Sequence, residues 1–134
     1  MVKMNVLYQG EKHCELTHGP SGQIIATDAP KDNNGRGEAF SPTDLCAVSL
    51  ATCMLTVMAI NAEKENVNLN GATAEVTKEM QASPRRISRI GVSLRLPSSL
   101  SSEWREKLEQ IAHNCPVKLS LHPDIKIDVA FQYA

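Results

Sequence analysis

Four cysteines are the most reactive side chains of this chain: Cys14, Cys46, Cys53 and Cys115. They form no C-x-x-C pair and no spacing typical of a zinc ribbon, and the four histidines do not complete a metal-ligand pattern, so we expect no metal and no cofactor. No secretory signal is visible in the sequence. We therefore expect a cytoplasmic protein with free thiols, each either a buried packing residue or redox-active.

Two of these cysteines fall on apolar faces of predicted helices. Cys53 lies in an uncharged run over residues 45–62. Cys46 lies in the same run but is expected to serve packing alone. Cys115 is followed by Pro116, which can begin another helix, and a helix N-terminus lowers the pKa of a thiol. The inward stripe spaced at i, i+4, i+7 and i+11 consists of Trp104, Leu108, Ile111 and Cys115. The residues alone leave packing and reactivity both open for Cys53 and Cys115.

The pattern of capping, apolar and polar residues predicts the helices and strands that position these thiols. Ser41 is a suitable N-cap, Pro42 fits the first helical position, and Asp44 complements the positive end of a helix that we expect to reach about Glu65. Short strands are predicted before it. The alternating segment 86–97 and the segment 125–133 predict strands after it.

This order of strands, long helix, two strands, helix and strand predicts an α+β fold in one domain over residues 1–134. Short turns between neighbouring strands predict antiparallel sheets around a long buried helix. The run 45–62 is long enough for a membrane span, but its Ser, Thr and Asn residues and its many alanines favour a buried helix. One small sheet cannot cover that helix, so we expect a partner subunit to cover its other side.

The composition excludes several partners. The formal net charge is -1 and aromatic residues make up 4% of the chain. Neither value favours binding to nucleic acid or to an anionic membrane surface. We therefore expect neither nucleic-acid nor membrane partners.

The segment "SPTDLCAVSLATC" resembles the helix of the osmotically inducible protein C and organic hydroperoxide resistance (OsmC/Ohr) family. That helix has a Pro, an acidic residue, an apolar alanine-rich turn and then a cysteine after a small residue. The family's second cysteine lies some sixty residues further on, and here Cys115 in "NCPVKLSL" lies 62 residues after Cys53. The order of the elements also matches, over nearly the whole chain.

The resemblance implies a thiol peroxidase of the OsmC-like type, in which Cys53 attacks a hydroperoxide and becomes a sulfenic acid. Cys115 would resolve that acid as a disulfide, and an external dithiol would restore both thiols. The resemblance also implies an intertwined homodimer with its active sites at the subunit interface.

The family's peroxidases also use an Arg and a Glu at the thiolate. The family Glu follows the helix-starting Pro, where this chain has Thr43, and Asp44 comes one residue later. A one-residue shift turns a helical side chain by more than a quarter of a circle. In the loop before the helix, Arg36 matches the Arg of part of the family, and Glu38 is another candidate carboxylate. The missing Glu supports an alternative, a non-catalytic dimeric protein that binds a small apolar molecule or senses redox state.

Overall fold

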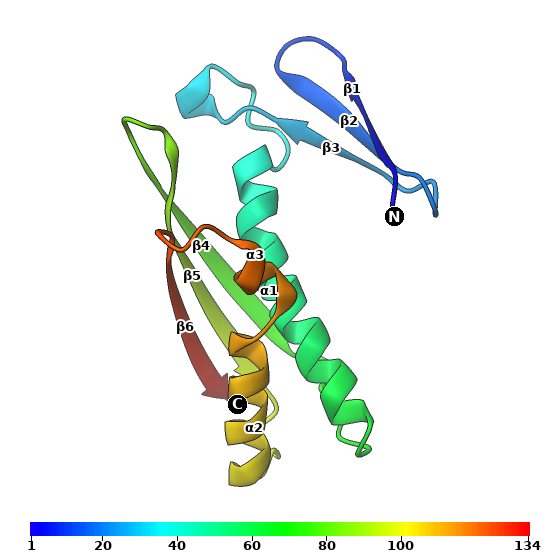
Figure 1. Cartoon of the computed structure of the whole chain (residues 1–134), viewed down its shortest axis with the longest axis vertical. Coiled ribbons are helices and arrows are strands. Elements are labelled where there is room, and N and C mark those ends of the chain that lie inside the picture. Colours follow the sequence, from blue (N-terminus) through cyan, green and yellow to red (C-terminus); the bar gives the residue numbers. More distant parts are fainter. The chain divides into compact units, whose positions relative to one another are not determined.

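Three short strands form the first sheet: β1 (Met4–Tyr8), β2 (His13–His18) and β3 (Ile24–Asp28). They pair antiparallel in the order β1-β2-β3 (Figure 1). The computed structural model describes residues 1–134, which group into two compact units, 1–46 and 47–134. The sheet belongs to the first unit. The prediction of one domain stays a prediction.

The loop between β3 and the long helix folds back on itself. It contains a short helical turn, η1 (Lys31–Asn33), and the Gly37 N–H donates a hydrogen bond to the Ala29 carbonyl over 3.1 Å. Gly35 lies so close to Ala29 that a Cβ at position 35 would stand 1.8 Å from that carbonyl oxygen. Only glycine fits there.

The long helix α1 (Pro42–Glu63) starts where the sequence predicts and ends two residues earlier than expected. The Ser41 N–H donates to Asp44 Oδ2 over 2.9 Å, and the Asp44 N–H donates to Ser41 Oγ over 3.0 Å. These reciprocal bonds form a capping box, which satisfies two backbone donors at the helix start. Asp44 therefore stabilises the first turn of α1.

By length and composition, α1 is the one helix of the chain that could cross a membrane. The core helix of a soluble protein meets the same criterion, and one face of α1 is buried within the protein. The buried side chains of this helix are Ala47, Leu50, Ala51, Met54, Met58 and Ala62.

The second sheet contains β4 (Thr73–Gln81), β5 (Arg86–Leu96) and β6 (Lys126–Tyr133), in that spatial order. β4 and β5 pair antiparallel, as expected for neighbours joined by a short turn. β6 instead pairs parallel with β5, which corrects the expectation of antiparallel sheets. The physical reason is the connection: two helices separate β5 from β6, and such a crossover returns the chain in the same direction.

Those two helices are α2 (Ser102–His113) and α3 (Pro116–Ser120), which lie with α1 on one face of the sheet (Figure 1). The alternation predicted for β5 is confirmed. Its inward side chains are almost fully buried, and they are Ile90, Val92, Leu94 and Leu96.

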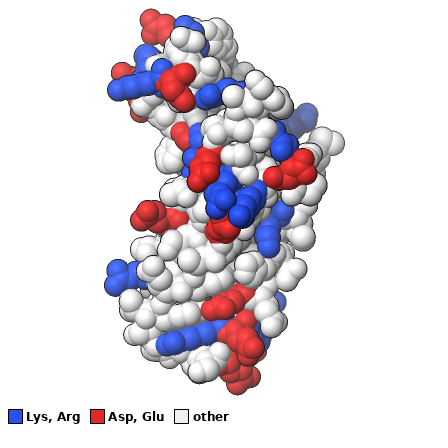
Figure 2. Space-filling model, turned by 90° about the vertical axis from the view of Figure 1, so that its left-hand side faces the viewer, with Lys and Arg blue, Asp and Glu red and all other residues white.

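The other face of this sheet is polar. Arg89 of β5 donates to Asp128 of β6 over 2.7 Å and lies 3.7 Å from Glu79 of β4. Figure 2, which looks onto the left-hand side of Figure 1, shows positive and negative side chains interspersed. The basic residues of β5 are thus part of a solvated face with mixed charge.

Candidate active site

Two thiols of the second unit contact each other. Cys53 lies on α1, Cys115 is the N-cap of α3, and the two side chains are close enough for Cys53 to raise the pKa of Cys115. Both are free thiols. Cys53 is half-buried, whereas the exposed fraction of Cys115 is 0%. The structure thus brings together the two cysteines that the sequence singled out.

Cys115 is the N-cap of α3 and does not lie on α2 itself, because α2 ends at His113. The Lys118 backbone N–H donates to Cys115 Sγ over 3.4 Å. Burial nevertheless raises the pKa of the Cys115 thiol above its usual value, and the contact with Cys53 raises it further. The N–H bond from Lys118 is the second-largest influence and lowers the pKa of Cys115, but burial outweighs it.

The expectation that a helix start lowers the pKa of this thiol is thus overridden by burial. A thiol with a raised pKa keeps its proton at neutral pH and can donate its S–H to a neighbouring sulfur. The pair is therefore asymmetric: Cys115 is the buried, protonated member, and Cys53 is the member that solvent can reach.

The residues around Cys115 add a small polar cluster. Lys118 Nζ lies 3.3 Å from His113 Nδ1, and the His113 ring packs edge-on against Phe131 with ring centres 5.9 Å apart. His113 is exposed, as expected for a residue at a helix end. His113 and Lys118 thus contact each other across Cys115, one from each side of it in the chain.

The two remaining cysteines, Cys14 on β2 and Cys46 on α1, are half-buried. No group of three or more His, Cys, Asp or Glu side chains is placed to hold a metal ion.

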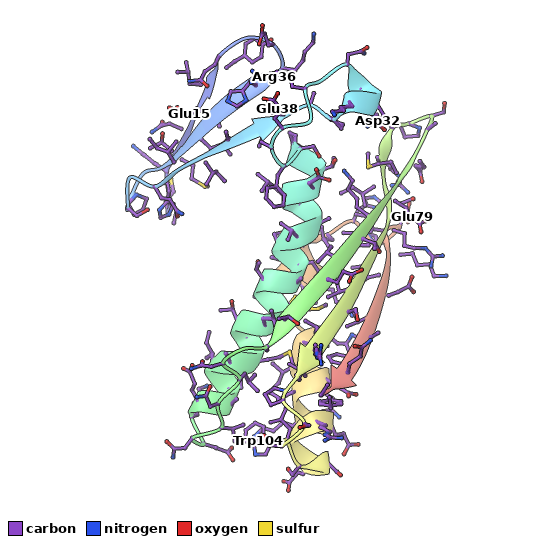
Figure 3. The ribbon with its side chains drawn as sticks, turned by 180° about the vertical axis from the view of Figure 1, so that it is seen from behind. Glu15, Asp32, Arg36, Glu38, Glu79 and Trp104 are labelled. Carbon is purple, nitrogen blue, oxygen red and sulfur yellow. The ribbon has the colours of Figure 1, made fainter.

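Arg36 lies in the first unit and forms two ion pairs there. Its Nη2 is 3.4 Å from Asp28 Oδ1, and its Nη1 is 3.4 Å from Glu11 Oε2. Figure 3 shows Arg36 and Glu38 beside the first sheet, in the loop that leads to α1. Glu38 contributes its backbone N–H, which donates to Asp28 Oδ2 over 3.1 Å.

Asp28 is the residue at the centre of this cluster, and sequence reasoning missed it. Its side chain is 1% exposed, and His13 Nδ1 lies 2.6 Å from its Oδ1. The hydrogen bond with His13 is the largest influence that lowers the pKa of Asp28, and the Arg36 charge lowers it further against the effect of burial. The available signal was register: pairing of β2 with β3 sets His13 directly opposite Asp28.

The family model of OsmC-like proteins matches residues 35–130. A solved structure from Psychrobacter arcticus 273-4, a candidate osmotic stress induced and detoxification response protein, is 44% identical to the chain. The match covers 98% of this chain and 96% of that one, with a TM-score of 0.94. A search of the curated proteins finds no match.

Two more distant structures share the fold. The organic hydroperoxide resistance protein OsmC from Legionella pneumophila is 18% identical, with a TM-score of 0.73 over 98% of this chain and 96% of that one. An organic hydroperoxide resistance protein from Elizabethkingia anophelis is 14% identical, with a TM-score of 0.75 over 100% and 96%. At these identities the likeness concerns the fold.

Proposed function

The chain belongs to the OsmC-like protein family, and on this premise we propose that it is a thiol-dependent peroxidase that reduces organic hydroperoxides. The observation that carries the proposal is the contact between the free thiols of Cys53 and Cys115. Relatives of the same fold are named organic hydroperoxide resistance proteins, which agrees with this chemistry.

The proposed cycle has three steps. The Cys53 thiolate attacks the outer oxygen of the hydroperoxide, the O–O bond breaks, and the alkoxide leaves and takes up a proton as an alcohol. Cys53 is then a sulfenic acid. The Cys115 sulfur attacks the Cys53 sulfur and releases water, which leaves a disulfide. An external dithiol reduces that disulfide by exchange and is itself oxidised.

The asymmetry of the pair supports this division of roles. A peroxide must reach the attacking sulfur, and Cys53 is half-buried whereas Cys115 is fully buried. Cys115 needs to react only with the sulfur beside it. Its raised pKa disfavours the thiolate form at Cys115, so Cys115 is the poorer nucleophile toward peroxide.

The partners follow from the same proposal. We expect Arg36 to hold the peroxide and the thiolate, and Asp44 to support the start of the helix that carries Cys53. We expect a cytoplasmic homodimer that uses a peroxide and a dithiol without a bound cofactor. Exposed apolar side chains favour the dimer, because a second copy would remove them from water. In the first unit these include Met4, Val6, Leu7, Tyr8 and Phe40.

The test is peroxide consumption by purified protein with an organic hydroperoxide and a dithiol in excess. We expect turnover by the wild type, no consumption above background by Cys53→Ser, and wild-type turnover by Cys46→Ser. The Cys46 variant is a matched control because it removes a half-buried thiol from the same helix. Consumption by Cys53→Ser at the wild-type rate would refute the proposal.

A second function is favoured by one observation at the start of α1. Position 43 is a threonine, and the neighbouring Asp44 is engaged in the capping box. A member of the family without a helix-borne carboxylate for the arginine could bind a small apolar molecule without turnover. Reaction of the wild type with hydroperoxide no faster than free cysteine, together with ligand binding that survives Cys53→Ser, would select this function.

A further inference from the structure

We propose that Asp28 is a positioning residue of this protein: it holds Arg36 in the orientation that the peroxide step uses. The inference rests on the proposed function. It assigns the carboxylate partner of Arg36 to β3, although the sequence offered Asp44 and Glu38 as candidates.

Groups from two other segments, β2 and the loop between β3 and α1, meet at the Asp28 carboxylate. His13 on β2 contacts Oδ1 over 2.6 Å, Arg36 contacts the same oxygen over 3.4 Å, and the Glu38 N–H donates to Oδ2 over 3.1 Å. The Asp28 backbone N–H also donates to the Phe40 carbonyl over 3.2 Å. The loop that carries Arg36 is therefore attached to Asp28 through the arginine side chain and through the backbone of two residues that follow it, Glu38 and Phe40.

Because Asp28 is buried, neighbouring groups must compensate its negative charge. A carboxylate that is 1% exposed is stable as an anion only when charged or polar partners replace its water. Asp28 therefore requires His13, Arg36 and the Glu38 N–H as partners, and its two carboxylate oxygens determine where these groups lie. Glu11, the other carboxylate on Arg36, has a side chain that is 78% exposed and can move freely with solvent.

Arg36 keeps the capacity to bind a second ligand while it is held. A guanidinium has five N–H donors in a rigid plane, and the two ion pairs engage one Nη atom each, both at 3.4 Å. The side chain is 40% exposed. Asp28 thus holds one Nη atom of the guanidinium, and the N–H donors that the two ion pairs leave over are available to an oxygen-rich ligand such as a hydroperoxide.

The experiment combines Asp28→Asn, Arg36→Lys and the double variant, with Glu11→Gln as the matched control. The first readout is the second-order rate of Cys53 oxidation by an organic hydroperoxide. The second is alkylation of Cys53 by iodoacetamide, which needs no arginine. The third is tryptic cleavage after Arg36 in the folded protein, which reports how firmly the loop is held and does not depend on activity.

We expect Asp28→Asn to slow oxidation by about ten- to a hundredfold, because a small misplacement of a positioning group has an effect of this size. The double variant should be no slower than Arg36→Lys, because one residue acts through the other. Alkylation of Cys53 should stay at the wild-type rate in Asp28→Asn. Cleavage after Arg36 should rise in Asp28→Asn, and Glu11→Gln should have a much smaller effect on every readout.

Two results would overturn the inference. One is unchanged cleavage after Arg36 in Asp28→Asn, which refutes the anchoring of the loop whether or not the protein reduces peroxide. The other is independent effects of the two substitutions that multiply in the double variant. A wild type that reacts no faster than free cysteine would instead refute the proposed function, and the cleavage result would still decide the anchoring.

Discussion

The thiol pair and the Asp28 cluster are built on opposite physical principles. Cys53 and Cys115 belong to an apolar region, where burial favours neutral groups and raises the pKa of Cys115. Asp28 is buried as deeply, yet its pKa is lowered, because His13 and Arg36 favour its charged form. Similar burial therefore has opposite consequences, and the partners of the buried group decide which one occurs.

The comparison suggests a division of labour between the two units. In the proposed function, the second unit provides the nucleophile Cys53 and the resolving thiol Cys115. The first unit provides an arginine in an ionic network. Substitutions in one region should leave the other region unchanged, and the largest effect is expected at Cys115.

Removal of the buried thiol should stop the catalytic cycle after one step. We expect Cys115→Ser to consume one hydroperoxide per chain and then to stall, because the Cys53 sulfenic acid has no internal thiol to resolve it. A sulfenic-acid probe should label Cys53 in this variant and not in the wild type. Sustained turnover by Cys115→Ser at the wild-type rate would show that Cys115 does not resolve the intermediate.

The apolar region should lose stability through packing alone. Leu94 has an exposed fraction of 0%, so Leu94→Ala should lower the free energy of unfolding by about 2–5 kcal/mol. Denaturant unfolding would measure this loss, which should be the same at pH 5 and pH 7. Arg95→Ala, at the next position on the solvated face, is the control and should change stability by less than about 0.5 kcal/mol. A loss for Leu94→Ala that depends on pH would contradict the account.

Substitution in the ionic region around Asp28 should instead cause a loss of stability that depends on pH. The pKa of Asp28 lies below its ordinary value of 3.8 in the folded protein, so its contribution is present above that value and is lost as the pH falls through the lowered pKa. Asp28→Asn should therefore lower the Tm by a constant amount from neutral pH to about pH 5. In stronger acid the two melting curves should converge, and a difference that grows towards acid would contradict this sign.

The smallest effect is expected at the helix start. Asp44→Ala should lower the free energy of unfolding by about 0.5–2 kcal/mol, because it removes the capping bond to the Ser41 N–H. Asp44→Asn keeps an oxygen acceptor and should lose less. Peroxide consumption measured on the folded fraction of Asp44→Ala then shows whether this carboxylate also acts in catalysis.

Local patterns were sufficient to predict much of the apolar region. The alternation in β5 identified its buried face, and the Ser41, Pro42 and Asp44 sequence marked the start of α1. Cys53 and Cys115 could be paired because the pattern predicted each of them on an apolar face and the family resemblance implied their roles. Fold and thiol pair thus followed from periodicity and from one resemblance.

The ionic cluster and one strand direction could not be predicted in the same way. The contacts of Asp28 join three segments whose proximity depends on strand register and on the path of the loop. The parallel direction of β6 depends on the helical crossover that precedes it, and alternation is the same in either direction. Tertiary connections determined the direction of β6 and the contacts of the loop with Asp28, and only the His13–Asp28 contact could have been inferred, from the register of the β2–β3 pair.

The central claim is that Cys53 and Cys115 form a reactive pair. The most direct measurement is peptide mass mapping of the reduced wild type after one equivalent of an organic hydroperoxide. The account predicts loss of two thiols per chain and a disulfide between Cys53 and Cys115, with Cys14 and Cys46 still free. Oxidation that leaves Cys53 and Cys115 as thiols, or that joins either of them to Cys46, would contradict it.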